Sequence, residues 1–173
     1  MVNKTESNVL VYIDDNGVCK IKLVGQIKYG SNAKGFGEFV NTKVVQRSVT
    51  DVIVDLRECD FIDSTNIGNL VKIAKIQQEK GAKLPTLVYA EDSKIASTIS
   101  EVSIATLFDV CIDKEMGENS YENVGNAETT QAELAKIMYD NHKILSDLNS
   151  VNKEKFEMVM KYLGESVSVM ERK

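Results

Sequence analysis

Short apolar segments alternate with longer amphipathic segments along residues 8–113, and this alternation constrains the fold more than any other feature. The apolar segments are rich in β-branched residues and bounded by turn-forming residues, which is typical of strands. The longer segments repeat apolar side chains every three or four residues, the period of a helix with one buried face. The order therefore predicts an α/β domain in which helices pack on a mixed β-sheet.

The first two expected strands form a hairpin. Residues 9–14 are mostly apolar and run into the turn-forming sequence Asp15-Asn16-Gly17. Beyond the turn, Cys19, Ile21 and Leu23 alternate with lysines, as in a half-buried strand. Further strands are expected at residues 52–54, 87–90 and 110–112, and the first of these is expected to be central and covered on both faces.

Amphipathic helices are predicted between these strands. Their apolar spacings span residues 36–44, 67–74 and 95–102. Gly81 is placed to end the second helix, because glycine readily adopts the left-handed backbone found there. Together with the strands, these helices complete an α/β domain over residues 1–113.

A linker and a helical extension are expected after the domain. Residues 114–128 hold four glutamates and two glycines, which predicts a solvated acidic linker. Residues 129–173 are predicted to be a helical extension. A first apolar stripe comprises Leu134, Ile137, Ile144, Leu148 and Val151, is widened by Met138 and Leu145, and is interrupted by Asn141; a second helical stretch carries Phe156, Val159, Met160 and Leu163.

A stripe this short favours a helix that docks on another surface over an autonomous coiled coil. Either the α/β domain or a second molecule could cover it. We expect the domain's own surface, because the linker is long enough for the helix to fold back. Asn141 would then either set the register of the helix or face a polar group of its partner surface.

Charge and hydropathy argue against two classes of partner. The net charge is −5, and no run of lysine or arginine offers the basic face that nucleic acid requires. The longest apolar run, residues 9–13, is far shorter than the roughly 18 residues of a membrane span. The first residues lack the apolar core of a signal peptide, so a soluble cytoplasmic protein is expected.

The usual residues of metal and nucleophilic sites are sparse. Cys19, Cys59 and Cys111 show no metal-ligand spacing, and we interpret them as reduced, buried thiols. His142 is the only histidine and is expected to be solvated. Gly30, Gly35 and Gly37 match neither phosphate-binding glycine pattern, and Asp55, Asp60 and Asp63 are expected to be solvated. We therefore expect no catalytic residues, no metal and no cofactor, and hence no enzyme.

One short stretch at the start of the second predicted helix stands out. It comprises Asp63, Ser64, Thr65, Asn66, Ile67 and Gly68. Aspartate, serine, threonine and asparagine are the side chains that best cap a helix N-terminus. On these residues alone, a plain helix cap is the simplest interpretation.

The surrounding sequence resembles the STAS domain of bacterial anti-sigma factor antagonists. The family pattern is a β-branched strand, an Asp-Leu step, a short connector, and then Phe-apolar-Asp-Ser-(Ser/Thr)-Gly-apolar-Gly opening a helix. Residues 52–68 follow it, with Asn66 standing where the family has glycine. Gly25 and residues 80–83 match further positions, and the resemblance covers about residues 8–113. It implies the STAS fold.

The resemblance also implies a site and its partners. In the family, the serine after the aspartate is the phosphoacceptor, which here is Ser64, with Thr65 as the alternative. Residues 63–68 would bind an anti-sigma factor that is itself a serine kinase, and a metal-dependent phosphatase of the PP2C type would remove the phosphate. Phosphorylation would control transcription by ending that binding.

A second interpretation comes from the helical extension. The chain could be a non-catalytic scaffold subunit of a larger signalling assembly, docking through its C-terminal helices. Its mass in solution separates the two interpretations. A monomer or homodimer fits the antagonist, and a large homo-assembly fits the scaffold.

Overall fold

Strand β2 (Val18–Ile27) is the hub of the sheet in the computed structural model, which describes residues 6–173. It pairs antiparallel with β1 (Asn8–Ile13) and parallel with both β3 (Asp51–Asp55) and β4 (Cys59–Ile62). The turn between β1 and β2 is closed by Asp14, whose Oδ1 accepts from the backbone N–H groups of Asn16 and Val18. The predicted hairpin and the predicted mixed sheet are confirmed.

Within residues 6–173, seven strands form the sheet in the order β6-β5-β3-β2-β1-β7, with β4 attached to β2 beside this path. The strands β5 (Thr86–Tyr89) and β6 (Asp109–Ile112) extend the sheet in parallel on one side. On the other side, β7 (Glu122–Asn123) pairs antiparallel with β1. Strand β3 is central, and Val52, Ile53 and Val54 are all buried, as predicted for a strand covered on both faces.

Strand β4 was not predicted from the sequence. It has only four residues, of which Cys59 and Ile62 are buried while the two between them are exposed, so it lacks the alternation of a half-buried strand. It forms because β2 continues past β3 and offers it a partner, after an irregularity at Gly25. Gly25 has a φ of +74°, and a side chain there would meet the carbonyl oxygen of Glu6 at 2.9 Å.

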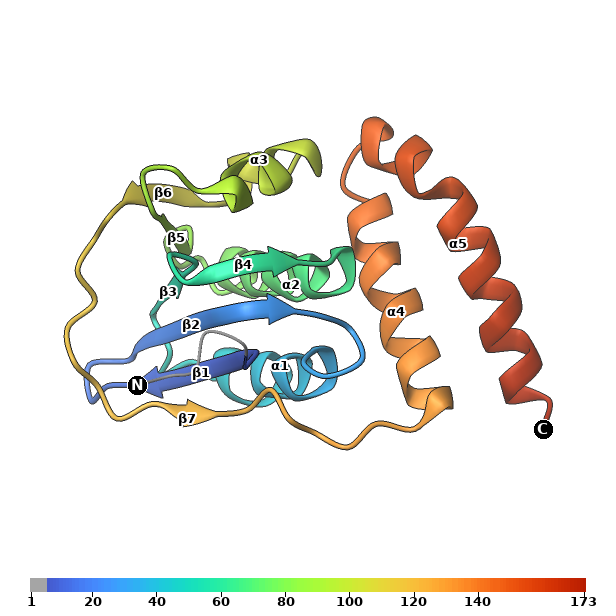
Figure 1. Cartoon of the computed structure of the whole chain (residues 1–173), viewed down its shortest axis with the longest axis horizontal. Coiled ribbons are helices and arrows are strands. Elements are labelled where there is room, and N and C mark those ends of the chain that lie inside the picture. The colour runs from blue at the N-terminus through green and yellow to red at the C-terminus, as the bar shows by residue number, and fades with distance from the viewer. Residues whose placement is uncertain (1–5) are drawn as a thin grey trace.

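The helices of the domain lie where the periodicity predicts them. They are α1 (Ala33–Phe39), which continues into the π-helical turn η1 (Val40–Val44), then α2 (Ser64–Glu79), α3 (Lys94–Glu101) and the 3-10 turn η2 (Ala105–Leu107). Figure 1 shows α1 and α2 side by side on one face of the sheet. Gly81 follows α2 with a φ of +69°, as its predicted role requires.

The segment 114–128 is only partly a solvated linker. It runs from β6 round the domain to the C-terminal helices (Figure 1) and forms β7 on the way. Met116 is buried against the sheet, and a side chain at Gly35 would meet the carbonyl oxygen of Val124 at 1.7 Å. The prediction of a freely solvated segment is therefore wrong for these residues, because pairing with β1 could not be seen in a polar sequence.

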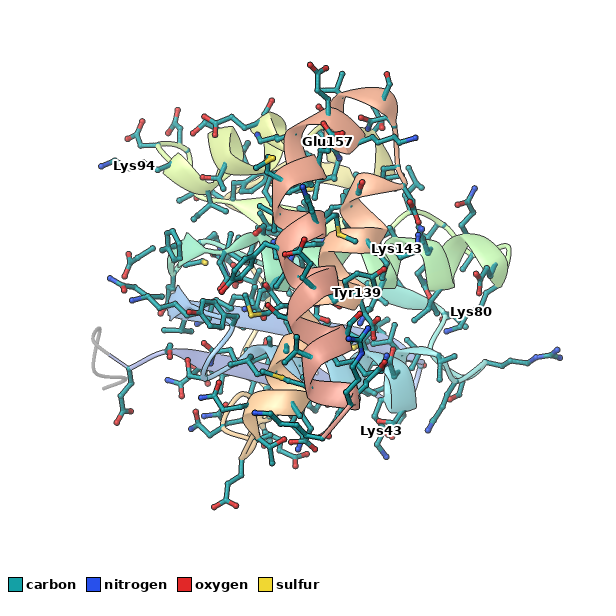
Figure 2. The ribbon with its side chains drawn as sticks, turned by 90° about the vertical axis from the view of Figure 1, so that its right-hand side faces the viewer. Lys43, Lys80, Lys94, Tyr139, Lys143 and Glu157 are labelled. Carbon is teal, nitrogen blue, oxygen red and sulfur yellow. The ribbon has the colours of Figure 1, made fainter. Side chains whose placement is uncertain are left out.

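The extension forms two helices, α4 (Gln131–Ser146) and α5 (Ser150–Glu171). Helix α4 packs on α2, and α5 lies across the outer side of α4, where Figure 2 shows it facing the viewer. The predicted first stripe does not continue to Val151, which is 60% exposed, because α4 ends at Ser146 and Asn149 caps a new helix. No helix in residues 6–173 is long and apolar enough to cross a membrane.

Candidate functional site

The candidate site lies where β4 passes into α2, and Asp63 organises this junction. Its backbone is extended, and its Oδ1 accepts from the backbone N–H of Asn66 at 2.9 Å, the geometry of an N-cap. Its Oδ2 accepts from the backbone N–H of Tyr29 at 2.5 Å, and its own N–H donates to the carbonyl of Ile27. The first turn of α2 is therefore tied to the end of β2.

Asp63 takes the capping role that four side chains of the stretch could have filled, which frees the hydroxyl of Ser64 for another use. Asn66 occupies the family's glycine position without strain. It lies within α2, and its Nδ2 donates to Asp63 Oδ1 at 3.0 Å. Among the described residues, the non-glycine positions with a positive φ are Ser103 and Asp113, so Asn66 needs no left-handed backbone.

The hydroxyl of Ser64 is hydrogen-bonded to a residue of the extension. Its Oγ lies 2.7 Å from Nε2 of His142 in α4, and Nδ1 of His142 lies 2.7 Å from the carbonyl oxygen of Met138. A carbonyl oxygen can only accept, so Nδ1 carries the proton of the neutral ring. It follows that Nε2 accepts and the Ser64 hydroxyl donates.

The surroundings of His142 favour this neutral ring. The residue is 5% exposed, contrary to the solvated position predicted, and its ring meets that of Phe156 edge-on at 5.7 Å. Burial lowers its pKa, while the Met138 carbonyl and the Asp63 carboxylate act in the opposite direction. The imidazole is therefore uncharged and can accept the hydrogen bond from the Ser64 hydroxyl.

Asn141 makes the second polar contact between α4 and α2. Its Nδ2 donates to the backbone carbonyl of Thr65 at 2.6 Å and to Asn69 Oδ1 at 3.1 Å. Asn69 in turn donates to the carbonyl of Ala33 in α1 at 3.2 Å. Of the two roles considered for Asn141, the structure shows the one in which it faces polar groups of the docking surface.

Gly68 allows the two helices to approach this closely. A side chain at this position would meet Asn141 Cβ at 2.6 Å and Asn141 O at 2.9 Å. Because the carbonyl oxygen, and Asn141 Cα at 3.1 Å, belong to the α4 backbone, no rotamer change could relieve the clash. Glycine at 68 is therefore a requirement of α4 docking.

Helix α4 contacts Ser64, Thr65 and Gly68 of the predicted partner-binding stretch. Asp63 and Ser64 are half-buried, whereas Thr65, Asn66, Ile67 and Gly68 are buried. Ser64 is thus the less buried of the two candidate phosphoacceptors, since Thr65 is 1% exposed. Sequence reasoning missed His142 and Asn69 as members of this site. The interruption of the α4 stripe by Asn141 was the available signal.

Two other groups of candidate residues lie elsewhere. Cys19 and Cys59 are buried, as predicted, and burial raises the pKa of each thiol to about 12, while Cys111 is half-buried. Asp55 is 1% exposed and paired with Arg57 Nη2 at 2.8 Å, so the prediction that it is solvated is wrong. Within residues 6–173, no group of three or more His, Cys, Asp or Glu residues could hold a metal ion.

A comparison with protein families agrees with this fold. The family model described as the STAS domain matches residues 10–108, more than half of the chain. A solved structure of the Bacillus cell fate determinant SpoIIAA in its phosphorylated form is similar at 14% identity and a TM-score of 0.49, over 61% of this chain and 90% of that chain. No curated protein matches the sequence. By its family match, the chain belongs to the STAS domain family.

Proposed function

We propose that the protein is a phosphorylation-controlled anti-sigma factor antagonist. It binds an anti-sigma factor that is also a serine kinase when Ser64 is unphosphorylated, and it releases that partner when Ser64 is phosphorylated. The observation that carries the proposal is the position of Ser64 in a STAS domain. Its hydroxyl lies in the first turn of α2, is half-buried, and is not needed as a helix cap.

A phosphate at this position suits a binding switch. It adds about −1.5 to −2 charges and three acceptor oxygens. The positive end of the helix dipole tolerates that charge, so the fold of the domain is preserved. A partner surface packed on the same turn would have to desolvate the phosphate, so binding is lost. A PP2C-type phosphatase would reset the switch.

The protein has no catalytic role in this proposal, although Ser64 and His142 form a hydroxyl–imidazole pair. A nucleophilic serine needs room for a substrate beside its Oγ. Here α4 lies over that atom, and the neighbouring Thr65 is buried. We expect no hydrolysis of p-nitrophenyl acetate or ATP above that of the His142→Ala variant. A rate that survives repurification and falls in that variant would contradict the assignment.

The decisive experiment is mass spectrometry of the protein purified from its own cells, before and after treatment with a serine phosphatase. We expect a fraction that carries one phosphate, mapped to Ser64. Ser64→Ala should abolish the phosphate and retain the kinase partner in pull-downs. Thr65→Ser, which keeps a hydroxyl at 65, is the control and should leave both the phosphate and the pull-down as in wild type. A phosphate on another residue, with Ser64→Ala behaving as wild type, would refute the proposal.

The scaffold function remains a second candidate because of the outer face of α5. Met158, Tyr162 and Val169 are 76%, 69% and 56% exposed. Multi-angle light scattering of the full chain separates the candidates. The antagonist predicts a monomer or a homodimer. A large homo-assembly that Tyr162→Glu dissolves would favour the scaffold.

A further inference from the structure

We propose that α4 and the kinase partner compete for one face of α2, and that a phosphate on Ser64 releases α4 from it. The α2 face consists of Ser64, Thr65, Gly68 and Asn69. The competition rests on the proposed function, because that function places the partner on the first turns of α2. The release of α4 by phosphate does not depend on which partner binds.

Occupation of the α2 face by α4 is specific. Each residue of the face meets a matching group: the Ser64 hydroxyl meets His142, and both the Thr65 carbonyl and the Asn69 amide oxygen meet Asn141. Gly68 has no side chain, so the α4 backbone can lie directly against it. An incidental contact would leave these buried polar groups unpaired, at a cost to stability, whereas here only the Asn141 amide oxygen among them has no partner within residues 6–173. A partner that uses this face must displace α4.

Phosphorylation removes the hydrogen bond that joins Ser64 to α4. The hydroxyl proton is lost, and the fully ionised form of the phosphate ester has no hydrogen to donate to His142 Nε2. Because Nδ1 keeps the ring proton against the Met138 carbonyl, the Nε2 lone pair would face phosphate oxygens. Protonation of the ring could remove this repulsion, but burial opposes it. The phosphate therefore favours the state in which α4 has left.

The docked helix also affects the unphosphorylated protein. Only molecules with α4 undocked can bind a partner on the α2 face, so the apparent affinity is reduced by the undocked fraction. The kinase needs the same opening to reach Ser64. The extension thus sets a threshold for both binding and phosphorylation, which a minimal STAS domain would lack.

The first test uses Gly68→Ala, with Gly164→Ala in α5 as the matched control. Both place alanine, the better helix former, in a helix. At 68 the new Cβ would overlap the α4 backbone, whereas at 164 it would lie 3.6 Å from the ring of Tyr139, an ordinary contact. We expect amide hydrogen exchange in α4 to accelerate at least about tenfold in Gly68→Ala alone. Equal exchange in both variants would refute occupation of the face.

The second test uses the full chain with phosphoserine incorporated at position 64. We expect α4 to lose exchange protection by about tenfold or more, while β3 keeps it. Unchanged protection of α4 would refute release by phosphate. It would leave the proposed function standing, since that function is decided by mapping the phosphate in cells.

The third test measures competition directly with Asn141→Ala, which alters α4 and leaves the α2 face intact. The probe is the kinase that Ser64→Ala captures and that phosphorylates wild-type Ser64 in vitro. We expect Asn141→Ala to bind this kinase several-fold more tightly than wild type does, and to be phosphorylated faster. Equal affinity and equal rate would refute competition. If no such kinase is captured, the proposed function fails, and with it the competition.

Discussion

Helices α4 and α5 belong to one hairpin, and each departs from the usual polarity of a surface helix in its own way. The most deeply buried side chains of α4 include the polar residues Asn141 and His142, whereas α5 exposes apolar Met158 and Tyr162 on its outer side. A helix that only covered a core would bury apolar residues and expose polar ones. The buried polar residues indicate that α4 is fitted to the polar start of α2, whereas Met158 and Tyr162 lie exposed on α5.

Both helices nevertheless hold the domain through a buried asparagine. Asn141 donates to the carbonyl of Thr65, and Asn152 at the start of α5 donates to the carbonyl of Val102 at 2.8 Å. Apolar contacts support each point, through Leu145 on α4 and Phe156 on α5. The two asparagines therefore attach the hairpin at separate places, only one of which involves the candidate switch.

The largest effect should separate the two helices by burial. Leu145 is fully buried in the core, and Met158 is 76% exposed. Leu145→Ala should lower the free energy of unfolding by about 2–5 kcal/mol, because a cavity forms, whereas Met158→Ala should change it by less than about 0.5 kcal/mol. Urea denaturation measures both. Equal losses would mean that α5 is buried in an assembly under the conditions used.

Asn141→Ala and Asn152→Ala compare the two attachment points. Asn141→Ala leaves the buried Asn69 amide oxygen without its side-chain donor, and Asn152→Ala does the same to the Val102 carbonyl. Each change should therefore cost about 1–3 kcal/mol of unfolding free energy. Their consequences at Ser64 should differ. We expect hydrogen exchange in the first turn of α2 to accelerate more with Asn141→Ala. The same acceleration in both would show that the hairpin detaches as one unit.

Ser64→Ala should have a smaller effect on stability. Asp63 keeps the helix cap, so the variant loses one hydrogen bond, worth about 0.5–1.5 kcal/mol. His142→Ala removes the other partner of the same bond. In a double-mutant cycle the combined loss should be smaller than the sum of the two single losses. Additive losses would show that the pair contributes no mutual stabilisation.

The smallest effect concerns pH. Burial lowers the pKa of His142, so the unfolded chain takes up a proton before the folded chain does. The stability that the neutral ring contributes is therefore complete above its ordinary pKa of about 6.5 and is lost as pH falls toward the depressed folded value. Asp63 is the charged group that opposes this shift.

Unfolding free energies measured between about pH 7.5 and 5.5 should fall in wild type but fall less in His142→Gln. If the two proteins lose stability equally as pH falls, the proton responsible is taken up by a group other than His142.

Periodicity and turn chemistry were enough to locate most of the domain. The hairpin of β1 and β2, the central β3 and the helix beginning at Ser64 all carry local patterns. The same patterns, with the resemblance they support, single out Ser64. Strand β4 and strand β7 carry no such pattern, because each is too short for alternation to be visible and each exists through its partner strand.

The sequence by itself determined the α/β domain, the candidate phosphoacceptor and an apolar extension that needs cover. Only the tertiary structure decided what that cover is, because a helical stripe specifies burial but not the surface that provides it. The pairing of His142 with Ser64 spans 78 residues, and that of Asn141 with the Thr65 carbonyl spans 76. From the local sequence alone, isolated polar residues on a helix are expected to face solvent. They became buried here because the start of α2 presents a hydroxyl, a carbonyl, an amide and a glycine at matching positions.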